Sequence, residues 1–126
     1  MGILNKILSQ VENKKNALRF ILDISKPYLN IPEARFAIAH AAFAAGNKKM
    51  ALDELEEIKS INPRWETAAL LKGYIIGKEL PEKALAHYQD FLRKNPKSNE
   101  VRLEYAKALT NLKKFDEAKK QFLKLV

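Results

Sequence analysis

The chain has 126 residues and a formal net charge of +8, with 47% hydrophobic and 30% charged residues. This apolar fraction is too high for a disordered chain, and the length suits one domain. The chain has no cysteine, which excludes disulfides, thiolate metal sites and cysteine nucleophiles. It also has no run of about 20 apolar residues that could span a membrane.

In chain order, the sequence predicts a degenerate helical hairpin over residues 1–31 and then three clear pairs of helices. The first helix of each pair carries apolar residues at spacings of three and four, and so does the second. The expected first helices are Glu33–Ala45, Trp65–Ile76 and Asn99–Leu112. The expected second helices are Lys48–Ile61, Pro81–Lys94 and Phe115 to the end of the sequence. No segment has a strand pattern.

Helix-breaking residues separate these segments. Gly46 and Asn47 suit a helix stop followed by a turn. Pro81 suits the first position of a helix, where its missing N–H costs nothing. Pro63 and Pro96 end the preceding helices because proline pushes the residue before it out of the helical region.

The second helices of the pairs repeat one pattern. Ala51, Ala84 and Ala118 are 33 and 34 residues apart, and one further step back of 34 reaches Ala17. A large apolar residue follows four positions after each of the three alanines: Leu55, Tyr88 and Phe122. A small residue followed by a large one at this period predicts close packing of two helices, repeated along the chain.

This pattern resembles the tetratricopeptide repeat family, a 34-residue helix–turn–helix unit. The resemblance is strongest at Ala84, Tyr88, Pro96, Ala118 and Phe122. It implies an all-α fold, a right-handed superhelix of antiparallel helix–turn–helix repeats, in a single repeat domain over residues 1–126. The repeats would be a degenerate N-terminal hairpin (1–31), two full repeats (32–64 and 65–98) and a partial one (99–126). The C-terminal pattern looks most like bacterial members of the family.

The resemblance also implies a function. Stacked repeats of this family line a concave groove with their first helices, and the groove usually receives a peptide or a helix of a partner protein. The expected groove residues are Phe36, His40, Phe43, Ala69, Gly73, Ile76, Leu103, Lys107, Thr110 and Asn111. Phe36 and Phe43 share one helix face, so they fit either the groove or the core of their own repeat.

Family members that grip the C-terminal carboxylate of chaperones use Lys, Asn and Arg on the first helices. The corresponding places here hold Phe36, His40, Leu70, Glu100 and Glu104. Two acidic side chains would repel a carboxylate, so the sequence argues against this class of ligand.

No motif indicates an enzyme, a metal site or a cofactor. His40 and His87 lie in different repeats and lack acidic neighbours at metal-binding spacing. The acidic run at residues 53–57 spreads around a helix surface, as in a solvated face. The sequence has no glycine-rich phosphate loop and no nucleotide fingerprint. The prediction is a non-catalytic scaffold.

Positive charge is concentrated in the second half. Residues 1–63 have nine Lys and Arg against seven Asp and Glu, whereas residues 64–126 have 14 against eight. A basic surface gives the alternative function, binding of nucleic acid or an anionic surface. Lysine far outnumbers arginine here and no recognition motif accompanies it, which argues against nucleic acid.

The last residues belong to an apolar second helix without a polar helix to cover it. Terminal repeats normally need a soluble outer face, so we expect a longer repeat protein or self-association through this end. The compartment stays open. The sequence as it stands fits the cytoplasm, and an upstream signal, if removed, would allow the periplasm or envelope.

Overall fold

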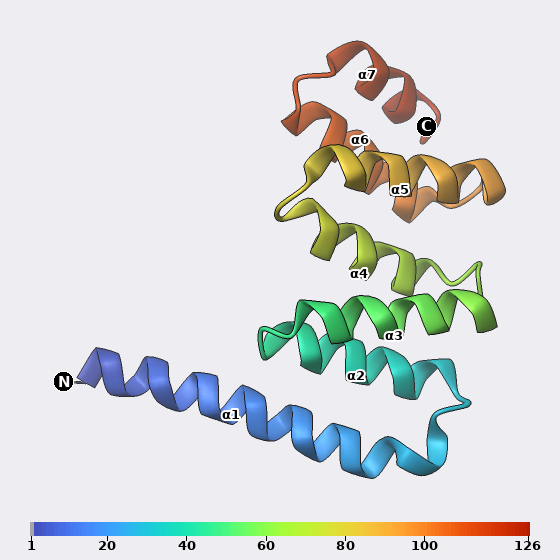
Figure 1. Ribbon diagram of the computed structural model, residues 1–126. Helices are drawn as coiled ribbons and strands as arrows, with labels where there is room; N and C mark the ends of the chain where they lie inside the picture. The colour runs from blue at the N-terminus through green and yellow to red at the C-terminus, as the bar shows by residue number, and fades with distance from the viewer. Residues whose placement is uncertain (1) are drawn as a thin grey trace. The chain divides into compact units, whose positions relative to one another are not determined.

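The computed structural model describes residues 2–126. In this range all regular secondary structure is helical, and short turns join the helices (Figure 1). Within this range the structure contains no strand, which agrees with the sequence. The helices are α1 (Gly2–Ser25), the short 3-10 helix η1 (Lys26–Tyr28), α2 (Pro32–Ala44), α3 (Lys48–Ile61), α4 (Glu66–Gly77), α5 (Pro81–Lys94), α6 (Asn99–Asn111) and α7 (Phe115–Leu123). Successive helices pack in pairs, so the predicted all-α fold of helical repeats is confirmed.

The helix ends follow from the breaking residues. The side chain of Asn47 accepts a hydrogen bond from the backbone N–H of Met50 (3.1 Å) and so caps the start of α3. Gly46 has a φ of 86°, the left-handed conformation that glycine adopts most readily. Pro81 lies at the start of α5. The bounds predicted for α3 and α5 match the observed ones at both ends.

The N-terminal region differs from the expected hairpin. Residues 2–25 form one continuous helix of 24 residues, because no glycine or proline interrupts the sequence between Gly2 and Pro27. The later half of this helix packs on α2, and only Ser25 in it is fully buried. The earlier half carries large exposed apolar side chains. They are Ile3, Leu4, Ile7, Leu8 and Val11, with exposed fractions of 44 to 79%.

The chain divides into two compact units, a first unit that ends at Pro63 and a second unit, Arg64–Val126. The single repeat domain that the sequence predicts over residues 1–126 stays a prediction. The division falls at the boundary between two predicted repeats, where Pro63 ends a helix.

The first unit has its core where α2 packs on α3. Each helix contributes both small and larger residues to this contact, and in α3 the small Ala51 is followed by the larger Leu55, as the repeated pattern predicts. The fully buried side chains are Ile38, Ala39 and Ala42 of α2 with Ala51, Leu55 and Ile58 of α3. Helix α1 contacts α2.

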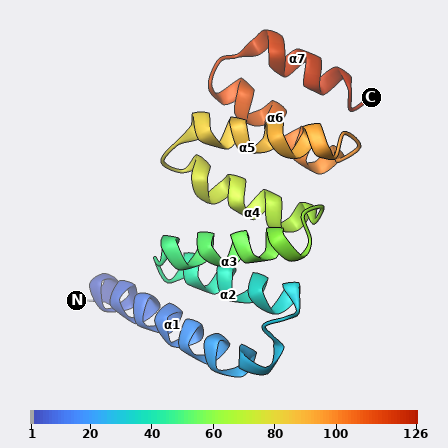
Figure 2. The same cartoon turned by 45° about the vertical axis from the view of Figure 1, so that its right-hand side comes forward.

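In the second unit, α5 packs against both α4 and α6, and α7 packs against α6 (Figures 1 and 2). Its core is larger and more aromatic, with Tyr88, Phe91 and Tyr105 buried among aliphatic side chains. The alanines of the repeated pattern, Ala84 and Ala118, are both buried in this cluster. This outcome agrees with close packing of two helices at each alanine.

Candidate functional site

The first helices of the second unit, α4 and α6, contact each other and carry exposed apolar side chains. Tyr74 of α4 and Leu103 of α6 are 54% and 42% exposed. The ammonium of Lys78 lies 4.6 Å from the centroid of the Tyr74 ring, a cation–π contact. We refer to Tyr74, Leu103 and the neighbouring Lys107 as the first-helix face.

Three predicted groove residues of α4 are placed mainly inside the unit. Ala69 is buried, and its carbonyl oxygen lies 2.8 Å from Nε2 of His87. Gly73 is buried against Tyr88, whose ring occupies the space that a Cβ at position 73 would need. Ile76 is half-buried against the same core. Ala69 and Gly73 therefore offer little surface to a partner.

The predicted groove residues of α6 are accessible. Leu103, Lys107, Thr110 and Asn111 are all exposed. The ammonium of Lys107 forms an ion pair with Glu104 (3.0 Å), and the hydroxyl of Thr110 donates to the carbonyl of Ala106 (2.9 Å). This part of the face thus offers an apolar side chain beside a charged pair.

The three predicted groove residues of α2 lie in the first unit. His40 is exposed, whereas Phe36 and Phe43 are half-buried. Neither phenylalanine is among the fully buried core residues of α2, which are Ile38, Ala39 and Ala42. Both rings thus keep part of their surface accessible.

Tyr74 is the residue of the first-helix face that the sequence did not single out. The repeat register placed Gly73 on the groove side, but the glycine is used to admit the Tyr88 ring, so the exposed side of α4 carries Tyr74. The sequence feature that could have indicated this packing is a glycine in one helix, Gly73, together with a large aromatic residue, Tyr88, in the next.

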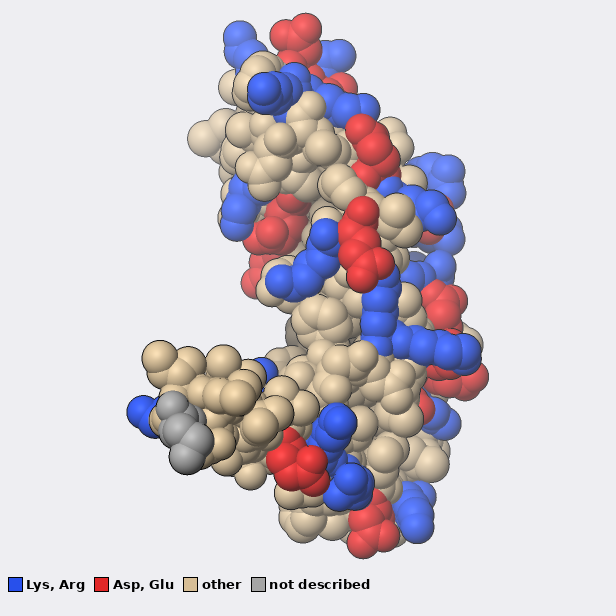
Figure 3. Space-filling view, turned by 60° about the vertical axis from the view of Figure 1, so that its left-hand side comes forward, with Lys and Arg blue, Asp and Glu red and all other residues tan. Residues whose placement is uncertain are grey.

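Several basic side chains of the second unit form ion pairs with acidic neighbours. Asp90 binds both Arg93 and Lys94, Lys114 lies 3.3 Å from Glu82, and Lys120 lies 3.9 Å from Glu117. On the face shown in Figure 3, Lys and Arg side chains lie beside Asp and Glu rather than forming one continuous patch. The basic residues that make no ion pair within residues 2–126 include Lys97, Lys113, Lys119 and Lys124.

Two buried tyrosines have altered acidity. Burial, and then the charge of Glu104, raise the pKa of Tyr88 to about 12. Burial, and then the charge of Glu117, raise the pKa of Tyr105. Both phenols therefore stay neutral at physiological pH and serve as core side chains.

The two histidines lie apart from acidic clusters. His87 is held by the Ala69 carbonyl and His40 is exposed on α2. Within residues 2–126, histidine and carboxylate side chains nowhere gather in threes as they would around a metal ion. In the same range, no helix is both long enough and apolar enough to cross a membrane.

The paired packing of short antiparallel helices, repeated along the chain, defines a helical-repeat protein. Residues 76–126 match the family model of the tetratricopeptide repeat. The resemblance to this repeat is therefore confirmed for residues 76–126, whereas the resemblance to bacterial members stays a prediction. No curated protein matches the chain.

Proposed function

We propose that this chain is a non-catalytic protein-interaction module that binds a peptide or helix of a partner protein on its first helices. Tetratricopeptide repeats generally mediate protein–protein interaction and are typically non-enzymatic scaffolds. The observation that carries the proposal is the exposure of Tyr74 and Leu103 on two first helices that contact each other.

The chemistry of the first-helix face suits an amphipathic ligand. An aromatic ring and a leucine side chain provide apolar contact area, and aromatic residues often anchor protein interfaces. Lys107 and Lys78 add positive charge at its margins. In the first unit, the half-buried Phe36 and Phe43 beside His40 offer a second, similar surface on α2.

Selection of a peptide from a displayed library, followed by calorimetric titration, tests this assignment. Leu103→Glu and Tyr74→Ala are expected to weaken the selected peptide at least about tenfold, the effect of losing a central anchor. Phe43→Ala tests the first unit and Lys107→Glu tests the charged margin. Leu123→Glu is the matched control, because Leu123 is also an exposed leucine but lies on α7. Unchanged affinity in the three variants of the first-helix face and in Phe43→Ala would refute the groove assignment.

The alternative function is binding of nucleic acid or an anionic surface through the basic second half. Its support is the group of lysines without ion pairs, Lys97, Lys113, Lys119 and Lys124. Titration with duplex and single-stranded oligonucleotides at low salt tests it. The alternative requires affinity that falls steeply with added salt, because binding releases counterions from the phosphates.

A further inference from the structure

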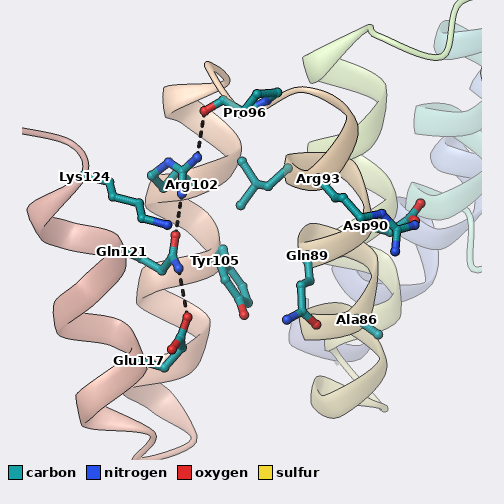
Figure 4. Close-up of a pocket in the computed structure, with 11 residues that line it drawn as sticks. Ala86, Gln89, Asp90, Arg93, Pro96, Arg102, Tyr105, Glu117, Gln121 and Lys124 are labelled. Atoms are coloured by element: carbon teal, nitrogen blue, oxygen red, sulfur yellow. Dashed lines mark hydrogen bonds and ion pairs between the residues drawn. The ribbon is translucent and has the colours of Figure 1, made fainter.

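The second unit contains a cleft on a different side of α6 from the first-helix face. It lies between α5, α6 and α7 and has a volume of about 800 Å³ (Figure 4). Arg102 and Tyr105 of α6 line it, whereas the neighbouring Leu103 and Lys107 do not. The rest of the polar lining comes from Gln89, Asp90 and Arg93 of α5, from Glu117 and Gln121 of α7, and from Lys124 just after α7.

Arg102 is a buried cation in this cleft and has no ionic partner among residues 2–126. Its side chain is among the buried charged groups, with 8% of the residue exposed. One guanidinium nitrogen donates to Oε1 of Gln121 (2.6 Å) and the other to the carbonyl of Pro96 (2.7 Å). Both acceptors are neutral. Within the described residues no carboxylate lies within ion-pair distance of this guanidinium.

The acidic residue nearby in the network does not neutralise Arg102 directly. Glu117 accepts a hydrogen bond from the amide nitrogen of Gln121 (2.9 Å), so the amide stands between the carboxylate and the guanidinium. Figure 4 shows this series as dashed lines from Pro96 to Arg102, Gln121 and Glu117. Asp90, which also lines the cleft, binds Arg93 and Lys94.

In the first unit, the arginine at the corresponding repeat position forms an ion pair. Arg35 and Glu54 are 19 residues apart, as are Arg102 and Gln121, and each arginine lies on a first helix with its partner on the following second helix. The guanidinium of Arg35 contacts the carboxylate of Glu54 at 3.1 Å. In the second unit, an amide replaces this carboxylate.

A buried charge without a counter-ion is costly, and guanidinium prefers carboxylate as its partner. We propose that the cleft between α5, α6 and α7 is a second binding site, which takes an acidic side chain of a partner peptide. The ligand carboxylate accepts hydrogen bonds from Arg102, and the ammonium of Lys124 adds a second positive charge. The cleft volume is typical of a site for one or a few residues of a peptide.

Fluorescence anisotropy with labelled hexaglutamate at low salt tests the site, with labelled hexaglutamine as the neutral probe. Gln121→Glu supplies the carboxylate internally, as Glu54 does for Arg35. Circular dichroism checks that the variant is folded, because the new carboxylate lies beside Glu117. We expect this variant to bind hexaglutamate about tenfold more weakly than the unmodified chain, the effect of losing a charge-assisted hydrogen bond. Hexaglutamine should bind neither protein.

Lys83→Gln is the matched control, because it lowers the net charge by the same amount. Lys83 is an exposed residue of α5 that does not line the cleft. It should change the affinity less than about twofold, since an exposed charge is screened. Equal losses in Gln121→Glu and Lys83→Gln would mean a general charge effect and would overturn the proposal. Absence of hexaglutamate binding to the unmodified chain would also overturn it.

Two further outcomes are informative. Labelled hexathymidylate that binds with the same sensitivity to Gln121→Glu, when hexaglutamate does not bind, would assign the cleft to nucleic acid instead. The Nε–H resonance of Arg102 should shift when hexaglutamate is added, and the shift should be lost in Gln121→Glu. A resonance that stays in place while the peptide binds would place the peptide elsewhere. None of these variants alters Tyr74, Leu103 or Lys107, so the first-helix face is tested separately.

Discussion

The hairpins α2–α3 and α6–α7 use the same arginine position in two ways. In α2–α3, Arg35 is matched by the carboxylate of Glu54, and both side chains are 20% exposed. In α6–α7, Arg102 is more deeply enclosed and is matched only by an amide and a backbone carbonyl. The difference shows that the repeat determines where the arginine lies. The residue 19 positions later determines whether the guanidinium has a counter-charge within the chain.

The comparison extends to the α4–α5 hairpin. Counting back one repeat of 33 residues, Gly73 corresponds to His40 and Tyr88 to Leu55. His40 is exposed in the first unit, where the smaller Leu55 fills the core, whereas Gly73 is buried beside the Tyr88 ring in the second. A larger core residue in the second helix has required a glycine in the first.

The largest expected effect comes from Gly73→Ala. The added Cβ would overlap the Tyr88 ring, and we expect the free energy of unfolding to fall by about 3 kcal/mol, as in an overpacked core. Urea denaturation followed by circular dichroism measures the change. Gly77→Ala is the control, because its Cβ would lie 3.4 Å from that of Ala84, an ordinary contact. Tyr88→Leu, which copies Leu55, should relieve most of the loss; a double variant as unstable as Gly73→Ala would contradict this explanation.

The next largest effect concerns alkaline pH. The pKa of Tyr88 rises from 10 in the unfolded chain to about 12 in the folded one, mainly because the ring is buried. The neutral phenol is thus favoured by folding. Its contribution is fully present below pH 10 and is lost as the pH rises toward 12, at a cost of roughly 2–3 kcal/mol.

Hydrogen exchange of the backbone amides, measured between pH 10 and 12, reports on the second unit through α5 and on the first unit through α3. Lysines also titrate there, so the measurement compares variants. Tyr88→Phe should reduce the loss of protection in α5, whereas Tyr74→Phe, at an exposed tyrosine, should leave it unchanged. If α3 and α5 lose protection equally in all three proteins, Tyr88 is not the cause.

A smaller effect is expected from exchanging the acceptors of the two arginines. Glu54→Gln should lower the free energy of unfolding by about 1 kcal/mol, because a charge-assisted hydrogen bond is stronger than a neutral one. Gln121→Glu should change it by less, because the new carboxylate gains the charge-assisted hydrogen bond from Arg102 but loses the one that Gln121 donates to Glu117 and faces that like charge. Thermal or urea unfolding of the two variants and the double variant measures both changes. A loss in Gln121→Glu as large as the loss in Glu54→Gln would contradict this explanation.

The smallest effect concerns the helix stops. Gly46 and Lys113 both have positive φ, 86° and 62°, and occupy corresponding places after α2 and α6. Each donates its N–H to the residue three before it, at 3.0 Å. Lys113→Gly should therefore stabilise the second unit by about 0.5–1 kcal/mol, since only glycine adopts this conformation without steric cost. No gain in the unfolding midpoint would indicate that the side chain of Lys113 contributes to stability.

The helices after residue 32 were predictable because proline, glycine and asparagine mark their ends. The hairpin expected over residues 1–31 was wrong, because the repeat register was carried into a segment without a breaking residue. The exposed side of α4 was missed for a physical reason. A glycine fits both a ligand groove and a close helix contact, and only the structure shows that the Tyr88 ring occupies the space. The 19-residue spacing shared by the two arginine pairs was visible in the sequence, but the burial of Arg102 was not.

The early part of α1 has a practical consequence for work in solution. Ile3, Leu4, Ile7, Leu8 and Val11 are exposed in the folded chain. Dyes that fluoresce on apolar surfaces usually report partial unfolding. Here they have a surface to bind in the native state. A fluorescent native sample is therefore no sign of damage, and loss of the signal in Ile7→Ser or Leu8→Ser would identify the helix as its source.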